Sequence, residues 1–170
     1  MNRGIIIGAV LLLLGGSLPA QAEQAETIGH WSLSVVKDTG TGEAISTAVL
    51  PGDPDQTRLV LQCIPSPESK DLFVGVVVGI DMDFRTEGKG TFQLDANPPV
   101  VAKWAFLEKM MILNQVDQPG FNAELMRQLA AASQLTVQSE TSDGATFTAR
   151  FALDRATEVV RRLFDACGVP

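Results

Sequence analysis

Two cysteines are the residues of this chain best suited to chemistry, because a thiol can form a disulfide, attack a substrate or bind a metal. Cys63 and Cys167 are the two cysteines in the 170-residue sequence, which has a single histidine. An even number of cysteines in an exported chain is typical of a disulfide, so we predict one bridge between them. Two alternatives stay open, namely a pair of buried thiols or a metal pair that lacks further Cys or His ligands.

A short acidic stretch has part of the pattern of a calcium-binding loop, in which oxygen ligands alternate along the chain. Asp81 and Asp83 have the spacing of such ligands, but Arg85 occupies the third ligand position and Thr86 the position of the glycine. A solvent-exposed strand face is therefore the preferred interpretation. The run Gly88-Lys89-Gly90 lacks the other residues of a phosphate-binding loop and is interpreted as a turn. We predict no metal and no cofactor.

No catalytic residue is predicted. His30 lies near the mature N-terminus, where chain ends are often mobile, whereas a serine–histidine–acid triad needs its histidine held in place. A pair of carboxylates could hydrolyse glycosides, but no pair stands out among 20 acidic residues. Trp31 and Trp104 lie on alternating segments, which favours core packing over a ligand platform. We therefore expect a protein without enzyme activity, and the alternative is a small secreted hydrolase or enzyme inhibitor whose site is not recognisable.

The first 22 residues have the pattern of a secretory signal peptide. Arg3 supplies the positive charge, Ile5–Leu14 the apolar region and Ala20-Gln21-Ala22 the cleavage site. The apolar run ends at Leu18 and is shorter than the roughly 20 residues that span a bilayer. We predict a signal peptide over residues 1–22, a single domain over residues 23–170, and a periplasmic or secreted protein without stable membrane insertion. An uncleaved N-terminal anchor is the alternative.

The charge of the chain argues against nucleic acid as a partner. There are 20 acidic and 13 basic residues, and removal of Arg3 with the leader changes the net charge from −7 to −8. A surface of this charge repels nucleic acid and anionic lipid. The Arg161-Arg162 pair is predicted to lie on the solvated face of a helix. The expected partner is another envelope or secreted protein.

These residues have to be positioned by a mostly β fold. Alternation of apolar and polar residues between Gly, Pro, Asp and Asn turns predicts about nine strands, within residues 31–36, 44–50, 59–63, 72–84, 91–94, 100–107, 110–116, 135–139 and 145–151. Hairpin turns are expected at Glu87–Gly90 and Ser142–Gly144. In the third strand Cys63 shares the apolar face, which suits a buried bridge. The fold class is α+β, mostly antiparallel β in a twisted sheet or sandwich, with two amphipathic helices.

The two helices are predicted at residues 119–132 and near the C-terminus. Asp154 is expected to be the N-cap of the second helix, whose apolar positions recur at three- and four-residue spacing. Continuation of this spacing places Cys167 on the buried face, and Gly168 ends the helix. The bridge should therefore join the last helix to the body of the domain.

The strand from Leu72 to Phe84 is the strongest candidate for a contact surface. It is long and rich in valine, and at a sheet edge it would offer unpaired backbone groups to a partner. The competing interpretation is a central, fully paired strand, because continuous apolar runs are more often buried. Val77 is the residue whose exposure distinguishes the two.

Several short motifs together resemble a group of small exported proteobacterial proteins, which includes the type VI secretion-associated VasI-type proteins and the invasion-associated locus B-like proteins. The resemblance rests on Trp31–Ser34, Leu59–Cys63, Phe92–Asp95, Trp104, Phe121 with Leu125 and Leu129, Leu135–Val137, Phe151–Leu153 and Ala166–Gly168. It covers nearly the whole mature chain. The resemblance implies the same fold, the Cys63–Cys167 bridge and an accessory role in the cell envelope, and it brings no catalytic residues.

Overall fold

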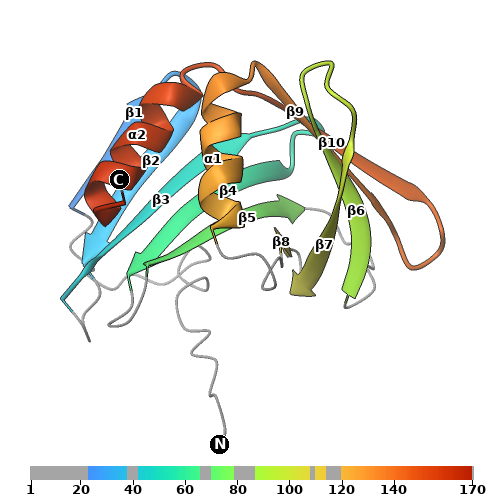
Figure 1. Ribbon diagram of the computed structural model, residues 1–170, viewed down its shortest axis with the longest axis horizontal. Coiled ribbons are helices and arrows are strands. Elements are labelled where there is room, and N and C mark those ends of the chain that lie inside the picture. Colours follow the sequence, from blue (N-terminus) through green and yellow to red (C-terminus); the bar gives the residue numbers. More distant parts are fainter. Residues whose placement is uncertain are drawn as a thin grey trace, which may run out of the picture.

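The computed structural model describes residues 23–37, 42–65, 70–78, 87–107, 110–113 and 120–169, which form one antiparallel sheet and two helices (Figure 1). The strands are β1 (Glu23–Ile28), β2 (Trp31–Lys37), β3 (Ala44–Pro51), β4 (Thr57–Pro65), β5 (Lys70–Val78), β6 (Glu87–Leu94), β7 (Val100–Leu107), β8 (Met110–Leu113), β9 (Gln134–Glu140) and β10 (Thr146–Ala152). The helices are α1 (Phe121–Ala131) and α2 (Ala156–Cys167). The order across the sheet is β1-β2-β3-β4-β5-β8-β7-β6-β9-β10. The predicted fold class is confirmed.

Two details of the predicted strands are wrong. The segment before Trp31, for which no strand was predicted, forms β1 and pairs with β2 through a tight turn that joins Ile28 to Trp31. Glu87–Gly90, expected to be a hairpin turn, is the first half of β6 and pairs with β7. Backbone pairing explains both differences, because a partner strand satisfies N–H and C=O groups even where the side-chain pattern is polar.

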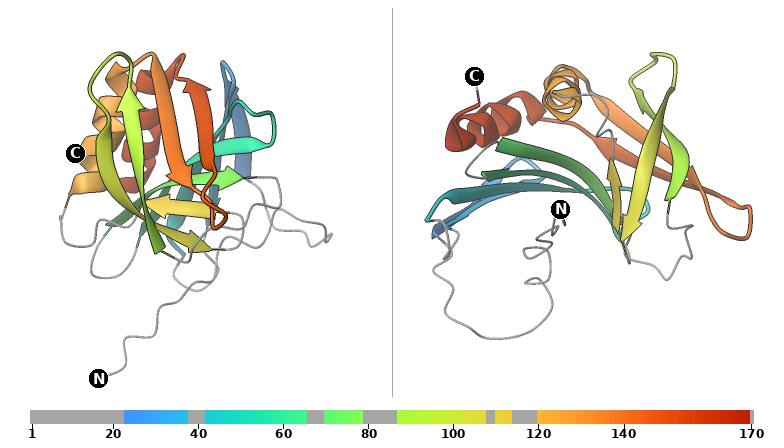
Figure 2. Two further views of the ribbon diagram at one scale, coloured as in Figure 1. Left: turned by 90° about the vertical axis from the view of Figure 1, so that its right-hand side faces the viewer. Right: turned by 60° about the horizontal axis from the view of Figure 1, so that its bottom comes forward.

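The strands β2, β3, β4 and β5 turn one row of side chains toward the helices. On β4 the buried side chains are Thr57, Leu59, Leu61 and Cys63, and the alternating positions between them are half-buried on the other side. Both helices lie on the same face of the sheet, α2 against β2, β3 and β4 and α1 against β5 (Figures 1 and 2). We call the face that meets the helices the inner face and the opposite one the outer face.

The sheet bends strongly, and its last strand returns toward its first half (Figure 2). Asp53, in the turn between β3 and β4, forms a two-way backbone bridge with Arg150 of β10, with N···O distances of 2.8 Å in both directions. Gly52 makes this approach possible, since a Cβ there would lie 2.6 Å from the Cδ1 atom of Phe151. The bridge therefore joins two strands that are distant in the sheet order.

Helix α2 begins differently from the prediction. Its N-cap is Arg155, with φ 63° and no side-chain hydrogen bond to the helix, so the prediction of Asp154 as N-cap is wrong. The carbonyl oxygen of Asp154 instead accepts a hydrogen bond of 2.9 Å from the indole Nε1 of Trp31. This bond, between residues far apart in sequence, fixes the chain direction into α2.

The end of α2 agrees with the sequence. Gly168 is the C-cap with φ 61°, a left-handed conformation that glycine adopts without steric cost. The buried side chains of α2 are Ala156, Val159, Val160, Leu163, Phe164 and Cys167. Neither described helix has the length and apolar character that crossing a membrane requires.

Candidate contact surfaces

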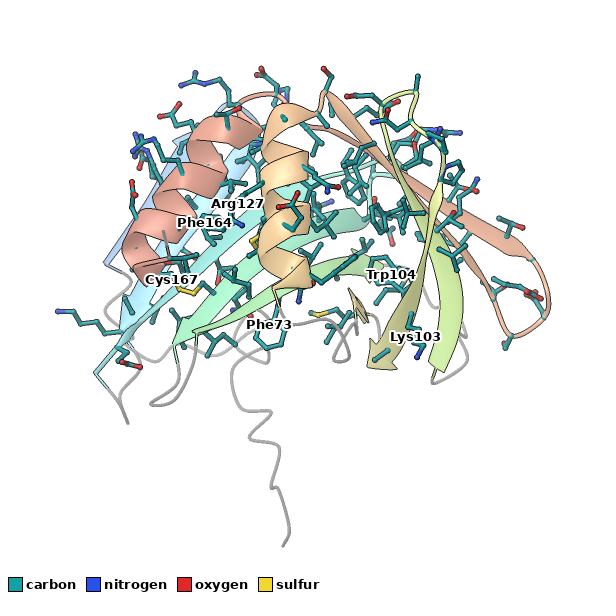
Figure 3. All side chains as sticks on the ribbon, viewed as in Figure 1. Phe73, Lys103, Trp104, Arg127, Phe164 and Cys167 are labelled. Atoms are coloured by element: carbon teal, nitrogen blue, oxygen red, sulfur yellow. A yellow bond between two sulfur atoms is a disulfide. The ribbon has the colours of Figure 1, made fainter. Side chains whose placement is uncertain are left out.

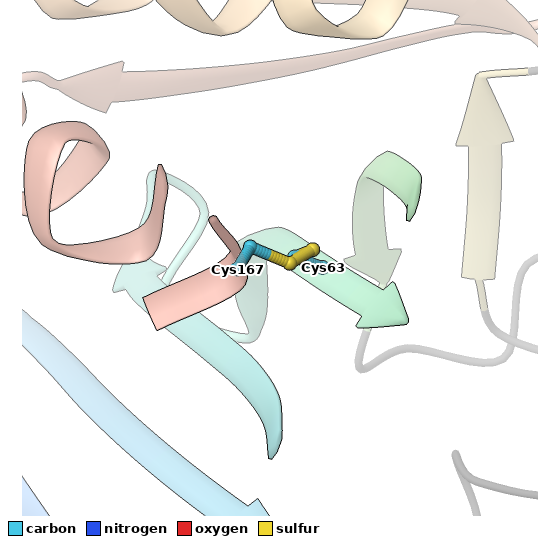
Figure 4. Close-up of a disulfide and its surroundings, with 2 residues drawn as sticks. All are labelled: Cys63 and Cys167. Carbon is cyan, nitrogen blue, oxygen red and sulfur yellow. A yellow bond between two sulfur atoms is a disulfide. The ribbon is translucent and has the colours of Figure 1, made fainter. Parts of the chain in front are cut away.

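The predicted disulfide is confirmed (Figure 4). Cys63 on the inner face of β4 is bonded to Cys167, the last residue of α2, and their Cα atoms are 6.3 Å apart. This separation is within the usual range for a disulfide, and both cysteines are at least 98% buried. The alternatives of buried thiols and of a metal pair are therefore excluded. The bridge anchors the C-terminal end of α2 to the centre of the sheet.

The remaining residues that the sequence suggested for catalysis or metal binding lie in a turn or in the core, or fall outside the described part of the chain. His30 is exposed in the turn between β1 and β2. Trp31 and Trp104 are buried in the core at 0% and 2% exposure, as their alternating segments predicted. Asp81, Asp83 and the residues up to Thr86 lie outside the described part of the chain. Within the described ranges, His, Cys, Asp and Glu side chains do not gather in threes that could hold a metal ion.

Within the part of the chain that the structure describes, two carboxylates have a lowered pKa, and both belong to local structural contacts. The pKa of Asp143 lies below its ordinary value because the Thr141 hydroxyl donates a hydrogen bond to it, in the turn between β9 and β10. The pKa of Glu158 is lowered chiefly by a hydrogen bond from Arg155, and Arg162 contributes as well. Arg162 also pairs with Glu26 of β1, which links α2 to the first strand. The hydrogen bonds to Asp143 therefore stabilise a turn, and those to Glu158 stabilise the surface of α2.

A shallow, open cleft of about 320 Å³ is lined by residues of α1 and α2 and by Val169. Its floor is apolar and contains Ala130, Val160, Phe164 and Val169, and its polar lining residues are Arg127, Thr157, Arg161 and Asp165. We call it the interhelix cleft. The Thr157 hydroxyl donates a hydrogen bond of 2.5 Å to the carbonyl oxygen of Ala130 and so ties the two helices together at one end.

The interhelix cleft combines an aromatic ring with positive charge. The guanidinium carbon of Arg127 lies 5.5 Å from the centroid of the Phe164 ring, within cation–π range (Figure 3). Arg161 lies one helical turn before Asp165 and pairs with it at 3.0 Å, with both side chains 64% exposed. Two arginines and one aspartate leave the lining with a net charge of +1, on a chain whose total charge is −7.

The strand proposed as an edge is central. β5 pairs with β4 along Thr57–Pro65 and with β8 at Gly75, Val76 and Val77. The prediction of a central strand is confirmed by the sheet order, with pairing on both sides at Gly75–Val77 and with β4 along Lys70–Val78, and residues 79–84 lie outside the described chain. Val77 is half-buried on the outer face, while Val74 and Val76 are buried beneath the helices.

Sequence reasoning did not find the interhelix cleft. Phe164 follows Val160 by one helical turn and widens the apolar stripe of α2, which was a readable signal. Arg127 gave no signal of its own, because an arginine on an amphipathic helix is ordinarily solvated. Its placement over Phe164 depends on the packing of α1 beside α2, which helix periodicity does not specify.

Comparisons with known proteins agree with this architecture. No family model and no curated protein matches the chain. The crystal structure of invasion associated protein B from Bartonella henselae matches with a TM-score of 0.56, over 84% of this chain and 95% of that one. The two chains share a fold. Their sequence identity is 12%, so the similarity concerns architecture alone. It supports the invasion-associated part of the resemblance at the level of fold, and the VasI-type part stays a prediction.

Proposed function

We propose that this protein is exported and acts without catalysis, as an accessory protein that contacts another envelope or secreted protein through the interhelix cleft. The signal-peptide pattern of residues 1–22 and the buried disulfide support export, since such bridges form and persist in oxidising compartments. The structural neighbour is named as invasion-associated, and a secretion- or invasion-associated role for this chain is part of the proposal.

The observation that carries the proposal is the composition of the cleft. Arginine and aromatic side chains dominate the energetics of protein interfaces, where a buried apolar centre is surrounded by polar groups. Arg127 over Phe164 supplies this combination, with Val160 as apolar floor. The local positive charge fits a partner segment that presents an apolar side chain beside a carboxylate. Because Arg161 is paired with Asp165, the excess positive charge of the lining is that of Arg127, which would favour a carboxylate on the partner.

The frame around the cleft is rigid, which lowers the entropic cost of binding. One wall, α2, is held at its end by the disulfide and near its start by the Trp31 hydrogen bond. The Thr157 hydroxyl bond joins that wall to α1. A partner segment therefore meets a cleft whose shape is already formed.

Export is tested by producing the full chain in a bacterial host and isolating the periplasmic and culture fractions. The proposal predicts a soluble protein that begins at Glu23, identified by intact mass. Retention of Met1 in the membrane fraction would contradict this part of the proposal.

Contact is tested by placing a photo-crosslinking amino acid at Ala130, which lines the cleft, in cells that produce the protein. Ala131 is the matched control, because it is the next residue of the same helix and is exposed elsewhere. The proposal predicts a discrete adduct from position 130 and not from position 131. Equal adducts from both positions would indicate non-specific collision and would argue against the cleft.

A further inference from the structure

The outer face of the sheet is apolar in its centre. The central strands carry outward side chains that are mostly apolar and half-buried by one another, namely Ile45, Val49, Val60, Ile64, Phe73, Val77, Met110 and Ile112. In the register, Val49 is opposite Val60, Val60 opposite Gly75, and Gly75 opposite Ile112. The four residues therefore form one row across β3, β4, β5 and β8. No described element lies over this row, since both helices pack on the inner face (Figure 2).

Strands with one covered face ordinarily alternate apolar and polar residues, whereas strands covered on both faces are apolar throughout. β5 from Leu72 onward and β8 follow the second pattern over their described residues, and β3 and β4 follow it in part, because their outward apolar residues flank one polar pair, in which the Gln62 amide donates a hydrogen bond of 3.0 Å to the Thr47 hydroxyl. Their inward rows are explained by the helices, but their outward rows are not explained by any described packing. The composition of the strands thus indicates that something covers the outer face.

The distribution of charge indicates what packs against the outer face. Among the outward positions of β2, β3, β4, β5 and β8 that the structure describes, the acidic residue is Asp71, which pairs with Ile64 at the start of β5, at the margin of the face. The centre of the face, around the row, has no acidic residue. The cation nearest the row, Arg58, bends back to the turn before β4 and donates to the carbonyl oxygens of Asp55 and Thr57. Two copies of an acidic chain repel least where carboxylates are lacking. A largely apolar face is also complementary to itself, which a twofold interface requires.

The available area fits a dimer. Strands spaced about 4.8 Å apart and rising about 3.4 Å per residue give the outer face from β2 to β8 an area of roughly 600 Å². Specific interfaces bury about 600 to 1,000 Å² per partner, so this face is sufficient at the lower end of that range. Val36, at the rim of the face, is 38% exposed and adds apolar surface.

We propose that the outer face is the interface of a homodimer, in which two copies pack sheet against sheet across the row formed by Val49, Val60, Gly75 and Ile112. Face-to-face packing of sheets about 10 Å apart is a common way to bury such rows. Because the helices lie on the inner faces, the two interhelix clefts point away from each other. The dimer therefore presents two identical clefts, which allows bivalent contact with a partner.

The test is the mass of the mature, disulfide-bonded protein in solution, measured by sedimentation over a range of concentrations. The wild type should approach the mass of two copies as concentration rises. Val60→Lys places a charge in the centre of the face and should weaken dimerisation at least about tenfold. Gln138→Lys is the matched control, because Gln138 is exposed on β9, outside the apolar row, and receives the same charge.

Two further measurements keep the test decisive if Val60→Lys does not fold. Thr47→Lys changes a polar, half-buried outward residue of β3 and should also favour the monomer. In the wild type, the methyl signals of Val49 and Val60 should shift with concentration, while those of Val159, a buried residue of α2, should not. A single-copy mass at every concentration would overturn the proposal. The proposal would also be overturned if the Thr47→Lys and Val60→Lys variants folded and dimerised as strongly as the wild type. These outcomes do not depend on the cleft.

Discussion

Removal of the disulfide should lower the stability of the domain by an amount set mainly by the loop it closes. Cys63 and Cys167 are 104 residues apart in sequence, and in the chain-entropy model a loop of about 100 residues contributes about 4.7 kcal/mol. Measured losses for native disulfides range from about 2 to 5 kcal/mol, which is the expected loss for Cys63→Ala/Cys167→Ala. For a domain of about 150 residues this corresponds to a fall in Tm of roughly 4 to 20 °C.

Denaturant unfolding with and without reductant measures this loss. The reductant should lower the midpoint of the wild type to near that of the double variant, and it should leave the double variant unchanged. Either single substitution opens the same loop, so Cys63→Ala and Cys167→Ala should each cost nearly as much as both together. Equal midpoints for oxidised wild type and double variant would refute the loop-closure reasoning, as would additive costs of the two single variants.

Three other changes test the fold. Asp95→Ala should lower the free energy of unfolding by about 2 kcal/mol, because the Oδ1 atom of Asp95 accepts two backbone N–H bonds of 2.9 Å at the start of β9 and its φ of 51° is unfavourable for alanine. Asp95→Asn should cost less, and equal unfolding midpoints for the two variants would contradict this reasoning. Gly52→Ala should cost about 1 to 3 kcal/mol by overpacking Phe151, and an unchanged thermal midpoint would exclude the close approach. Because the pKa of Asp143 is lowered in the folded protein, the stability that its carboxylate contributes is complete above the ordinary pKa of 3.8 and is lost as the pH falls through the pKa of the folded state. Thr141→Val should raise the pKa of Asp143 in an NMR titration, and an unchanged pKa would contradict the role of the Thr141 hydroxyl.

Much of the architecture was predictable because it depends on local periodicity. The alternation around Cys63 and the helical spacing that ends at Cys167 each identified a buried face, and two buried cysteines in an exported chain predict a bridge. The continuous apolar run of β5 was the reason for the competing interpretation of a central strand, which the sheet order confirms. In these cases one short segment contains the whole signal.

The features that sequence did not predict depend on partners distant in the chain. β1 has a polar composition and becomes a strand through pairing with β2. The N-cap of α2 is Arg155 and not the predicted Asp154, whose carbonyl oxygen accepts a hydrogen bond from Trp31. No property of residues 153–156 specifies this contact. The same reasoning applies to the interhelix cleft, which requires two helices separated by β9 and β10.

The central claim is that the interhelix cleft is the surface through which this protein contacts another protein. The most direct measurement compares the adduct formed from a photo-crosslinker at Ala130 in the wild type and in Arg127→Glu, in cells that produce each at equal level. Arg127→Glu reverses the charge beside Phe164, so the account predicts that a discrete adduct forms in the wild type and is lost in the variant. An adduct of equal yield and mass in both would contradict the account.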